Sequence, residues 1–228
     1  GLDENTTYTL LNLADGGITA FGAANMVQGA MPGGFDGLSW SVTDNQVALT
    51  TGNLITGSLY WRGLTSTAWN GAADNWSTDK AGAVASTTFP GAGTDVIFSH
   101  DGASGALTTT LEQNYRLNSL TFESGATTPA SVTINPGTNL ASRLEVSDHI
   151  TLSAGAPAAV TLATNYKIGA AQTWTVADAV TTLTFSGALL GAADVTKAGL
   201  GKVVLSAAAD PTFNATQTFD LTINTGTF

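Results

Sequence analysis

Two histidines, each next to an aspartate, are the first residues in this chain that could do chemistry. His100 precedes Asp101, and His149 follows Asp148. An imidazole beside a carboxylate can transfer protons, and with further ligands it can bind a metal ion. Adjacent residues of a strand face opposite sides, however, and no third ligand is recognisable near either pair. We therefore expect solvated turn residues at both places, with no metal and no cofactor.

Three tryptophans close together in the sequence offer a different chemistry. They are Trp61, Trp69 and Trp76, and the polar residues beside them are Asn70, Asp74, Asn75 and Asp79. Exposed indole rings with amides nearby can stack on sugars, which predicts a glycan-binding loop. The alternative is that the rings plug the first coil of a solenoid, whose end exposes its core and needs a cap. We favour the cap and keep glycan binding as the second interpretation.

A polysaccharide-degrading enzyme is the third interpretation. Glycoside hydrolysis needs paired carboxylates as acid and base. The Asn-x-Asp, Asp-Asp, Gly-His-Gly and Arg-x-Lys motifs of β-helical hydrolases are not present in this sequence. The basic residues Arg116, Arg143 and Lys167 also lack the matching acidic cluster that a lyase would need. We therefore expect no enzymatic activity.

The elements that must position these residues are short strands. No segment has the apolar recurrence of a helix, whereas an apolar-x-apolar triplet, often with a central Thr, recurs at intervals of roughly ten to twelve residues. The triplets begin at Leu120, Val132, Leu144, Ile150, Val160, Trp174, Leu183, Val203 and Leu221. In a strand the outer two residues of each triplet would face a core and the central residue would face solvent. This pattern predicts an all-β sandwich, barrel or solenoid.

Charge and composition exclude several classes of partner. The 228 residues include 17 acidic and 7 basic residues, a net charge of −10, and the basic residues are scattered. Nucleic acids and anionic membranes need clustered Lys and Arg, so we expect neither as a partner. The chain has no Cys, and no apolar run approaches the ~20 residues of a membrane helix, so we expect no membrane insertion.

The resemblance of one stretch to a known repeat signature favours the solenoid over the other all-β folds. Residues 195–206, Val-Thr-Lys-Ala-Gly-Leu-Gly-Lys-Val-Val-Leu-Ser, resemble the LTKTGAGTLTLSG signature of autotransporter-associated β-strand repeats. We expect Val195 to end one strand, Gly199 and Gly201 to turn a corner, and Val203 and Leu205 to face the same way on the next strand. Further similar motifs lie at 60–63, 69–70, 75–77, 94–98, 172–176 and 220–228.

The resemblance implies a right-handed parallel β-helix on the surface of a bacterial cell. It divides the chain into a closing or capping β segment (1–57), a Trp-rich opening or cap region (58–93) and parallel β-helix coils (94–228). The first segment is expected to contain short, partly antiparallel strands at Tyr8–Leu13, Gly16–Phe21, Leu38–Val42 and Gln46–Thr50.

Joining the end of the chain to its beginning gives an uninterrupted strand, turn and strand of the family pattern. This predicts a tandem array or a head-to-tail filament, in which an unfinished strand pairs with the next unit. The expected junction residues are Gly1, Leu2, Tyr8, Leu10, Leu221, Ile223 and Phe228. The alternative is a fragment with arbitrary boundaries.

The function expected from these observations is structural. Stacked coils give stiffness without cysteine, which suits an extracellular or cell-surface rod, filament or adhesin stalk. Its expected partner is a second copy, with glycans or host and environmental surfaces as further partners. A glycan-binding surface module that uses the three tryptophans is the alternative, and a β-helical polysaccharide-degrading enzyme is third.

Overall fold

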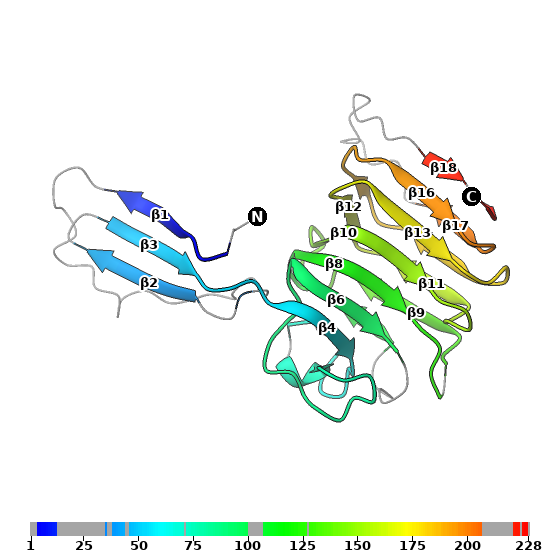
Figure 1. The fold of residues 1–228 in the computed structure, drawn as a ribbon, viewed down its shortest axis with the longest axis horizontal. Coiled ribbons are helices and arrows are strands. Elements are labelled where there is room, and N and C mark those ends of the chain that lie inside the picture. Colours follow the sequence, from blue (N-terminus) through cyan, green and yellow to red (C-terminus); the bar gives the residue numbers. More distant parts are fainter. Residues whose placement is uncertain are drawn as a thin grey trace.

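The structure is a computed structural model of the chain, and it describes residues 4–12, 35, 38–43, 46–70, 72–99, 107–126, 128–206, 221–223 and 225–227. The expected fold class is confirmed. The protein is all-β, with parallel sheets stacked as a β-solenoid of about four turns, and short antiparallel strands precede the solenoid. Figure 1 shows the stacked strands and, to one side of them, the separate small sheet of β1, β2 and β3.

The small N-terminal sheet is antiparallel. Its strands are β1 (Thr7–Asn12), β2 (Leu38–Thr43) and β3 (Gln46–Thr51), in the order β1-β3-β2. Three of the four strands expected here are therefore confirmed, and the fourth, Gly16–Phe21, lies outside the described residues. Tyr8, Leu49 and Trp40 stand opposite one another across the three strands.

The larger parallel sheet contains most of the solenoid. Its order is β18-β16-β13-β10-β8-β6-β4-β5, and β12 and β15 branch from β10. The strands are β4 (Thr56–Trp61), β5 (Trp76–Ser77), β6 (Gly93–Phe98), β8 (Tyr115–Phe122), β10 (Arg143–Leu152), β12 (Asn165–Ile168), β13 (Gln172–Val176), β15 (Leu189–Leu190), β16 (Val195–Ala198) and β18 (Leu221–Ile223). Every pairing along this path is parallel except that of β4 with β5.

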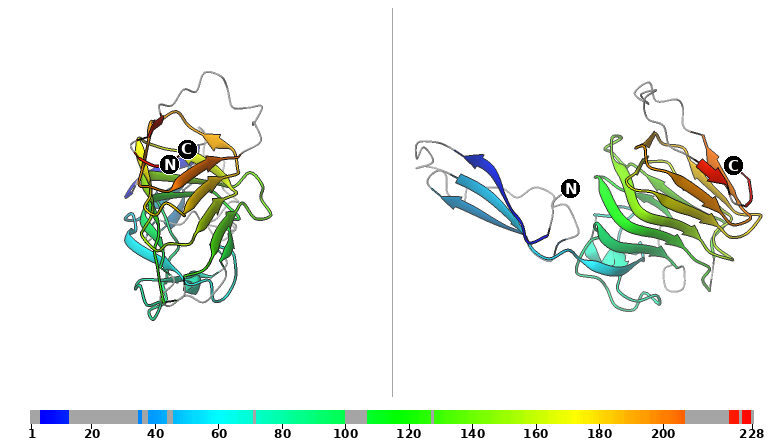
Figure 2. Two further views of the ribbon diagram at one scale, coloured as in Figure 1. Left: turned by 90° about the vertical axis from the view of Figure 1, so that its right-hand side faces the viewer. Right: turned by 45° about the horizontal axis from the view of Figure 1, so that its top comes forward.

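The second parallel sheet has the order β17-β14-β11-β9-β7. Its strands are β7 (Thr108–Thr110), β9 (Ser131–Asn135), β11 (Ala159–Leu162), β14 (Thr182–Phe185) and β17 (Lys202–Leu205). Figure 2 shows the strands of the two sheets from two further directions. The chain alternates between the sheets, so each circuit adds a strand to both.

The triplets predicted from sequence form the core between the two sheets. Both outer residues of each triplet from Leu120 to Phe185 are buried, and each central residue is partly exposed. Parallel register stacks these residues into columns, for example Val96, Leu120, Ile150 and Trp174. Burial of each such side chain contributes on the order of 1.5–3 kcal/mol, so the core is distributed evenly along the solenoid.

The signature stretch differs from expectation at one strand. Val195 does not end a strand but begins β16, Val195–Ala198, in parallel register with β13. This register places Lys197 opposite Trp174, in the inward column, and the lysine is fully buried. The corner after it is as expected, with Gly199 at φ +77°.

The solenoid sheet begins before the boundary suggested by the resemblance. β4 pairs in parallel with β6, from Thr56 with Gly93 to Tyr60 with Ile97. Thr56 to Trp61 therefore already form the first strand of the larger sheet, and the segment between β4 and β6 closes its end.

Candidate functional site

The three tryptophans proposed for sugar stacking lie inside the protein. Trp61, Trp69 and Trp76 have exposed fractions of 2%, 0% and 0%. The Trp76 ring packs edge-on against the other two, with centroid distances of 4.9 Å to Trp61 and 5.1 Å to Trp69. No ring face is available to a sugar, so glycan binding by these three residues is not supported. Their placement agrees with the cap interpretation.

The Trp-containing segment closes the first ends of both sheets. β5 pairs with the end of β4, and Ala68 forms a parallel bridge to Thr110, the last residue of β7. The indole of Trp69 donates a hydrogen bond to Thr109 Oγ1 at 3.1 Å, and the indole of Trp76 donates to the Trp69 carbonyl at 3.0 Å. Both buried indole N–H groups are thus satisfied, that of Trp69 by β7 and that of Trp76 within the cap.

Asn75 holds the loop of the cap in place. Its side chain is fully buried, and Oδ1 accepts hydrogen bonds from the backbone N–H of Thr65 (2.9 Å) and Ser66 (3.1 Å). Nδ2 donates to Ser66 Oγ (2.8 Å) and to the Ala68 carbonyl (3.1 Å). The sequence makes this amide a candidate sugar ligand, but all of these contacts are internal.

The carboxylate of Asp79 also makes hydrogen bonds within the cap. It accepts the backbone N–H groups of Val84 (2.5 Å) and Ala83 (3.1 Å) and the hydroxyl of Ser77 (2.9 Å). These hydrogen bonds, that of Val84 first, lower the pKa of the Asp79 carboxyl below its ordinary value. Asp79 is therefore an ionised carboxylate at neutral pH, and its hydrogen bonds hold the loop between Ser77 and Val84.

The pair Asp148 and His149 lies on a strand rather than in the expected turn. Asp148 Oδ2 is 2.7 Å from His149 Nδ1, and both side chains are substantially exposed. The register of β10 against β8 shifts between Val146 and His149, and this irregularity lets two adjacent side chains meet. His100 and Asp101 lie outside the described residues. Among the residues that the structure describes, no group of three His, Cys, Asp or Glu side chains could hold a metal ion.

An open groove of about 490 Å³ runs over β10, β13 and β16 beside this pair. It is lined by Asp148, His149, Thr151, Ala171, Gln172, Thr173, Thr175, Asp194 and Thr196. The parallel register aligns His149, Thr173 and Thr196 in one row and Thr151 with Thr175 in a second row. The groove therefore offers regularly spaced hydroxyls, two carboxylates and an imidazole. The sequence showed the outward threonines but not which of them share a face.

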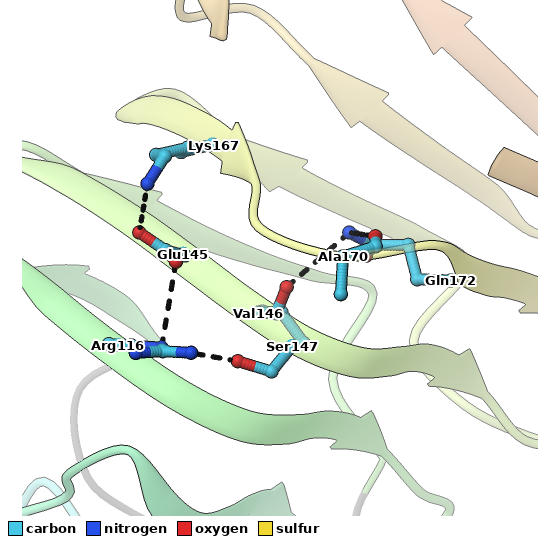
Figure 3. A network of polar contacts seen from close by, with 7 residues as sticks. All are labelled: Arg116, Glu145, Val146, Ser147, Lys167, Ala170 and Gln172. Atoms are coloured by element: carbon cyan, nitrogen blue, oxygen red, sulfur yellow. Dashed lines mark hydrogen bonds and ion pairs between the residues drawn. The ribbon is translucent and has the colours of Figure 1, made fainter. Parts of the chain in front are cut away.

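A charge network next to the groove was missed from sequence. Glu145 lies between Arg116 and Lys167, with its Oε1 3.5 Å from Arg116 Nε and its Oε2 2.9 Å from Lys167 Nζ (Figure 3). The signal that could have revealed it is a repeat, Asn-Tyr-Arg-Leu at 114–117 and Asn-Tyr-Lys-Ile at 165–168. The two copies pair with the same stretch of β10, one from each side.

The C-terminal end of the solenoid differs from the capped end. In the described part of the chain, β17 and β18 are the last strands of their sheets. The column Ile134, Leu162 and Phe185 is buried, but Leu205, next in that column, is 38% exposed. Leu200, at the corner before β17, is 64% exposed. Core positions thus reach the surface at this end.

The expected junction residues occupy three places. Leu221 and Ile223 belong to β18, which pairs in parallel with β16. Tyr8 and Leu10 belong to β1, and Leu10 is 54% exposed. Gly1, Leu2 and Phe228 lie outside the described residues. The structure of one chain leaves the junction itself a prediction.

No described helix has the length and apolar character needed to cross a membrane. Comparisons of the sequence with protein-family models and curated proteins, and of the fold with solved structures, found no match.

Proposed function

We propose that this chain is a structural unit of an extracellular rod, filament or adhesin stalk, in which β-solenoid units associate end to end. A long parallel stack with a continuous core is stiff in one direction and presents two different ends. Contacts between different ends are heterologous, and such contacts propagate into filaments when they do not close into a ring.

The observation that carries the proposal is the change in burial along one core column. Phe185 is 1% exposed, whereas Leu205, its neighbour in the next coil, is 38% exposed. At the capped end the apolar side chains are covered instead, since Trp69 and Trp76 are 0% exposed. Exposed apolar surface at a sheet edge favours association with another chain. A second copy of this chain is the partner that we propose for this end.

Sedimentation velocity over a concentration series tests the proposal. We expect the native chain to form larger species as its concentration rises, and electron micrographs to show them as linear. Leu205→Glu should shift the distribution to monomer, because a charge at this position opposes burial. Leu140→Glu is the matched control, since Leu140 is 76% exposed in the loop between β9 and β10. Circular dichroism of both variants must show the native strand content. Compact monomers of the native chain at all concentrations would refute end-to-end association.

Glycan binding is the second candidate function, and the groove over β10, β13 and β16 favours it in place of the buried tryptophans. Its rows of hydroxyls, with Asp148 and His149, can donate to and accept from sugar hydroxyls. Glycan-array binding by the native chain that is lost in the double variant Thr173→Val and Thr196→Val would support this role. Thr161→Val with Thr184→Val, a pair aligned on the other sheet, is the control. A polysaccharide-degrading activity stays the third hypothesis, and we expect none in a hydrolysis assay.

A further inference from the structure

Lys197 is a buried cation in a place where the rest of its column is apolar. It follows Trp174 in the inward column of the larger sheet, and its residue exposure is 0%. Its ammonium donates hydrogen bonds to three backbone carbonyls, those of Ala198 (3.1 Å), Gly199 (2.5 Å) and Thr225 (2.9 Å). Burial lowers the pKa of the Lys197 ammonium. A buried ammonium needs such partners, so the carbonyl group from Thr225 matters to its stability.

The segment Thr225–Thr227, which contacts this lysine, also pairs directly with the edge of β17. Thr225 Oγ1 donates to the Gly199 carbonyl at 3.1 Å. The backbone N–H of Val203 in β17 donates to the Thr227 carbonyl at 3.2 Å, and Lys202 forms a parallel bridge with Thr227. The segment therefore occupies the position in which an added strand would begin to pair with β17.

Gly226 allows the segment Thr225–Thr227 to approach Lys197 and the corner at Gly199 closely. Its φ is +81°, and a Cβ at this position would overlap the Lys197 ammonium and the carbonyl oxygens of Gly199 and Gly201. Any larger residue must push the segment away from the lysine. The three residues of the segment are themselves exposed, and hydrogen bonds join them to Lys197, to the corner at Gly199 and Gly201, and to β17.

We propose that Lys197 and Thr225–Thr227 form a latch over the edge of β17, and that a second copy adds to this end only when the latch opens. The part that concerns the second copy rests on the proposed function. The latch itself does not, because it is a contact within one chain. Opening removes one carbonyl from the buried ammonium and frees the Val203 N–H, which an incoming strand can then satisfy.

Pulsed reductive methylation followed by mass spectrometry tests the latch in the full chain. Lys202 is exposed and should react within the pulse, whereas Lys197 should react at least about tenfold more slowly, because reaction requires local opening. The lowered pKa of Lys197 would by itself speed this reaction, so slow labelling reports burial. Gly226→Ala should raise the Lys197 rate towards that of Lys202. Gly57→Ala is the control, since Gly57 has φ +99° and open space around its Cβ position.

The two parts of the proposal fail in distinguishable ways. Equal rates for Lys197 and Lys202 in the native chain, or no effect of Gly226→Ala, would overturn the latch. If Gly226→Ala releases Lys197 and also accelerates association in sedimentation experiments, both parts are supported. If it releases Lys197 while association proceeds as in the native chain, the latch exists but does not control assembly. Protection of Lys197 in the native chain, together with no association by the native chain or by Gly226→Ala, would leave the latch and remove the proposed function.

Discussion

Glu145 and Lys167 stand at the same register position on neighbouring strands, and their side-chain atoms Oε2 and Nζ are 2.9 Å apart. Arg116 occupies the equivalent position on the other side of Glu145. The side chain of Glu145 is only 12% exposed, whereas those of Arg116 and Lys167 are 50% and 37% exposed. One sheltered carboxylate therefore joins two cations from the preceding and the following coil.

Replacing this carboxylate should weaken the solenoid. We expect Glu145→Gln to lower the free energy of unfolding by about 1 kcal/mol, because it leaves the like charges of Arg116 and Lys167 close together without the carboxylate between them. The loss is no larger because solvent partly screens both ion pairs. Urea denaturation at low salt measures the loss. The effect should shrink at high salt. A double-mutant cycle with Lys167→Met gives the coupling energy, and a coupling of zero at low salt would contradict this prediction.

The strands of the solenoid could be predicted because the pattern within each triplet is sufficient to indicate a half-buried strand. In Leu183-Thr184-Phe185 the two apolar residues and the threonine between them fit only a half-buried strand, and the structure places them so. Which triplets stack on one another was not predictable from local pattern. The rows that make the groove depend on register between strands about 23 residues apart, such as Thr173 with Thr196.

The burial of Lys197 in the latch could not be predicted from the sequence. A lysine next to a glycine-rich corner ordinarily indicates a solvated position. Its burial depends on the carbonyls of Gly199 and Thr225, and the second of these is far away in the sequence. For a similar reason, the sequence leaves two interpretations of the tryptophans open. The hydrogen bond from Trp69 to Thr109, 40 residues later, and ring contacts with Phe98 and Tyr115 tie that ring to the inside of the stack.

Asn75 should be the most sensitive polar residue of the cap. We expect Asn75→Asp to lower the free energy of unfolding by about 2–3 kcal/mol, because a carboxylate oxygen would replace the amide that donates to the Ala68 carbonyl in a buried site. Thermal unfolding followed by near-ultraviolet circular dichroism reports directly on the tryptophans around it. Asn139→Asp is the control, since Asn139 is exposed. Equal losses in the two variants would show that the buried network has no special role.

Alkaline pH should destabilise the protein through its buried phenols. Burial raises the pKa values of Tyr166 and Tyr115 above the ordinary value of 10.0. The unfolded chain then releases these protons at a pH at which the folded chain still binds them. The stabilising contribution of each phenol is complete below pH 10 and is lost as the pH rises further. Lys197 acts in the opposite sense, since its lowered pKa makes stability increase with pH up to about its ordinary value of 10.5.

Urea denaturation at pH values above 10.5 isolates the tyrosine effect. We expect the free energy of unfolding to fall with pH in this range, and Tyr166→Phe to make the fall shallower. Near neutral pH the same variant should be less stable by about 1 kcal/mol, because it loses the hydrogen bond from the phenol to Gln172 Oε1 at 2.6 Å. An unchanged alkaline slope in Tyr166→Phe would exclude this residue as a cause.

The stacking of coils leaves no space at the corner glycine of the signature stretch. Gly199 has φ +77°, and an added Cβ would overlap the carbonyl oxygen of Val176, 23 residues earlier. That carbonyl already accepts the backbone N–H of Gly201 at 2.9 Å, so it cannot move without breaking a contact between coils. Neighbouring strands lie roughly 4.7–4.9 Å apart, which is too close for a side chain to enter between them.

Two alanine substitutions separate this close approach from the cost of the backbone conformation. Gly57 also has positive φ, +99°, but nothing lies within 4 Å of its Cβ position. We expect Gly57→Ala to lower the free energy of unfolding by about 1–2 kcal/mol, the cost of a left-handed conformation. Gly199→Ala should cost about 1–3 kcal/mol more, because the coils must also be forced apart. Urea denaturation of both variants measures the difference. Equal losses would mean that the corner glycine serves only the turn, and that the coils tolerate a wider separation at this point.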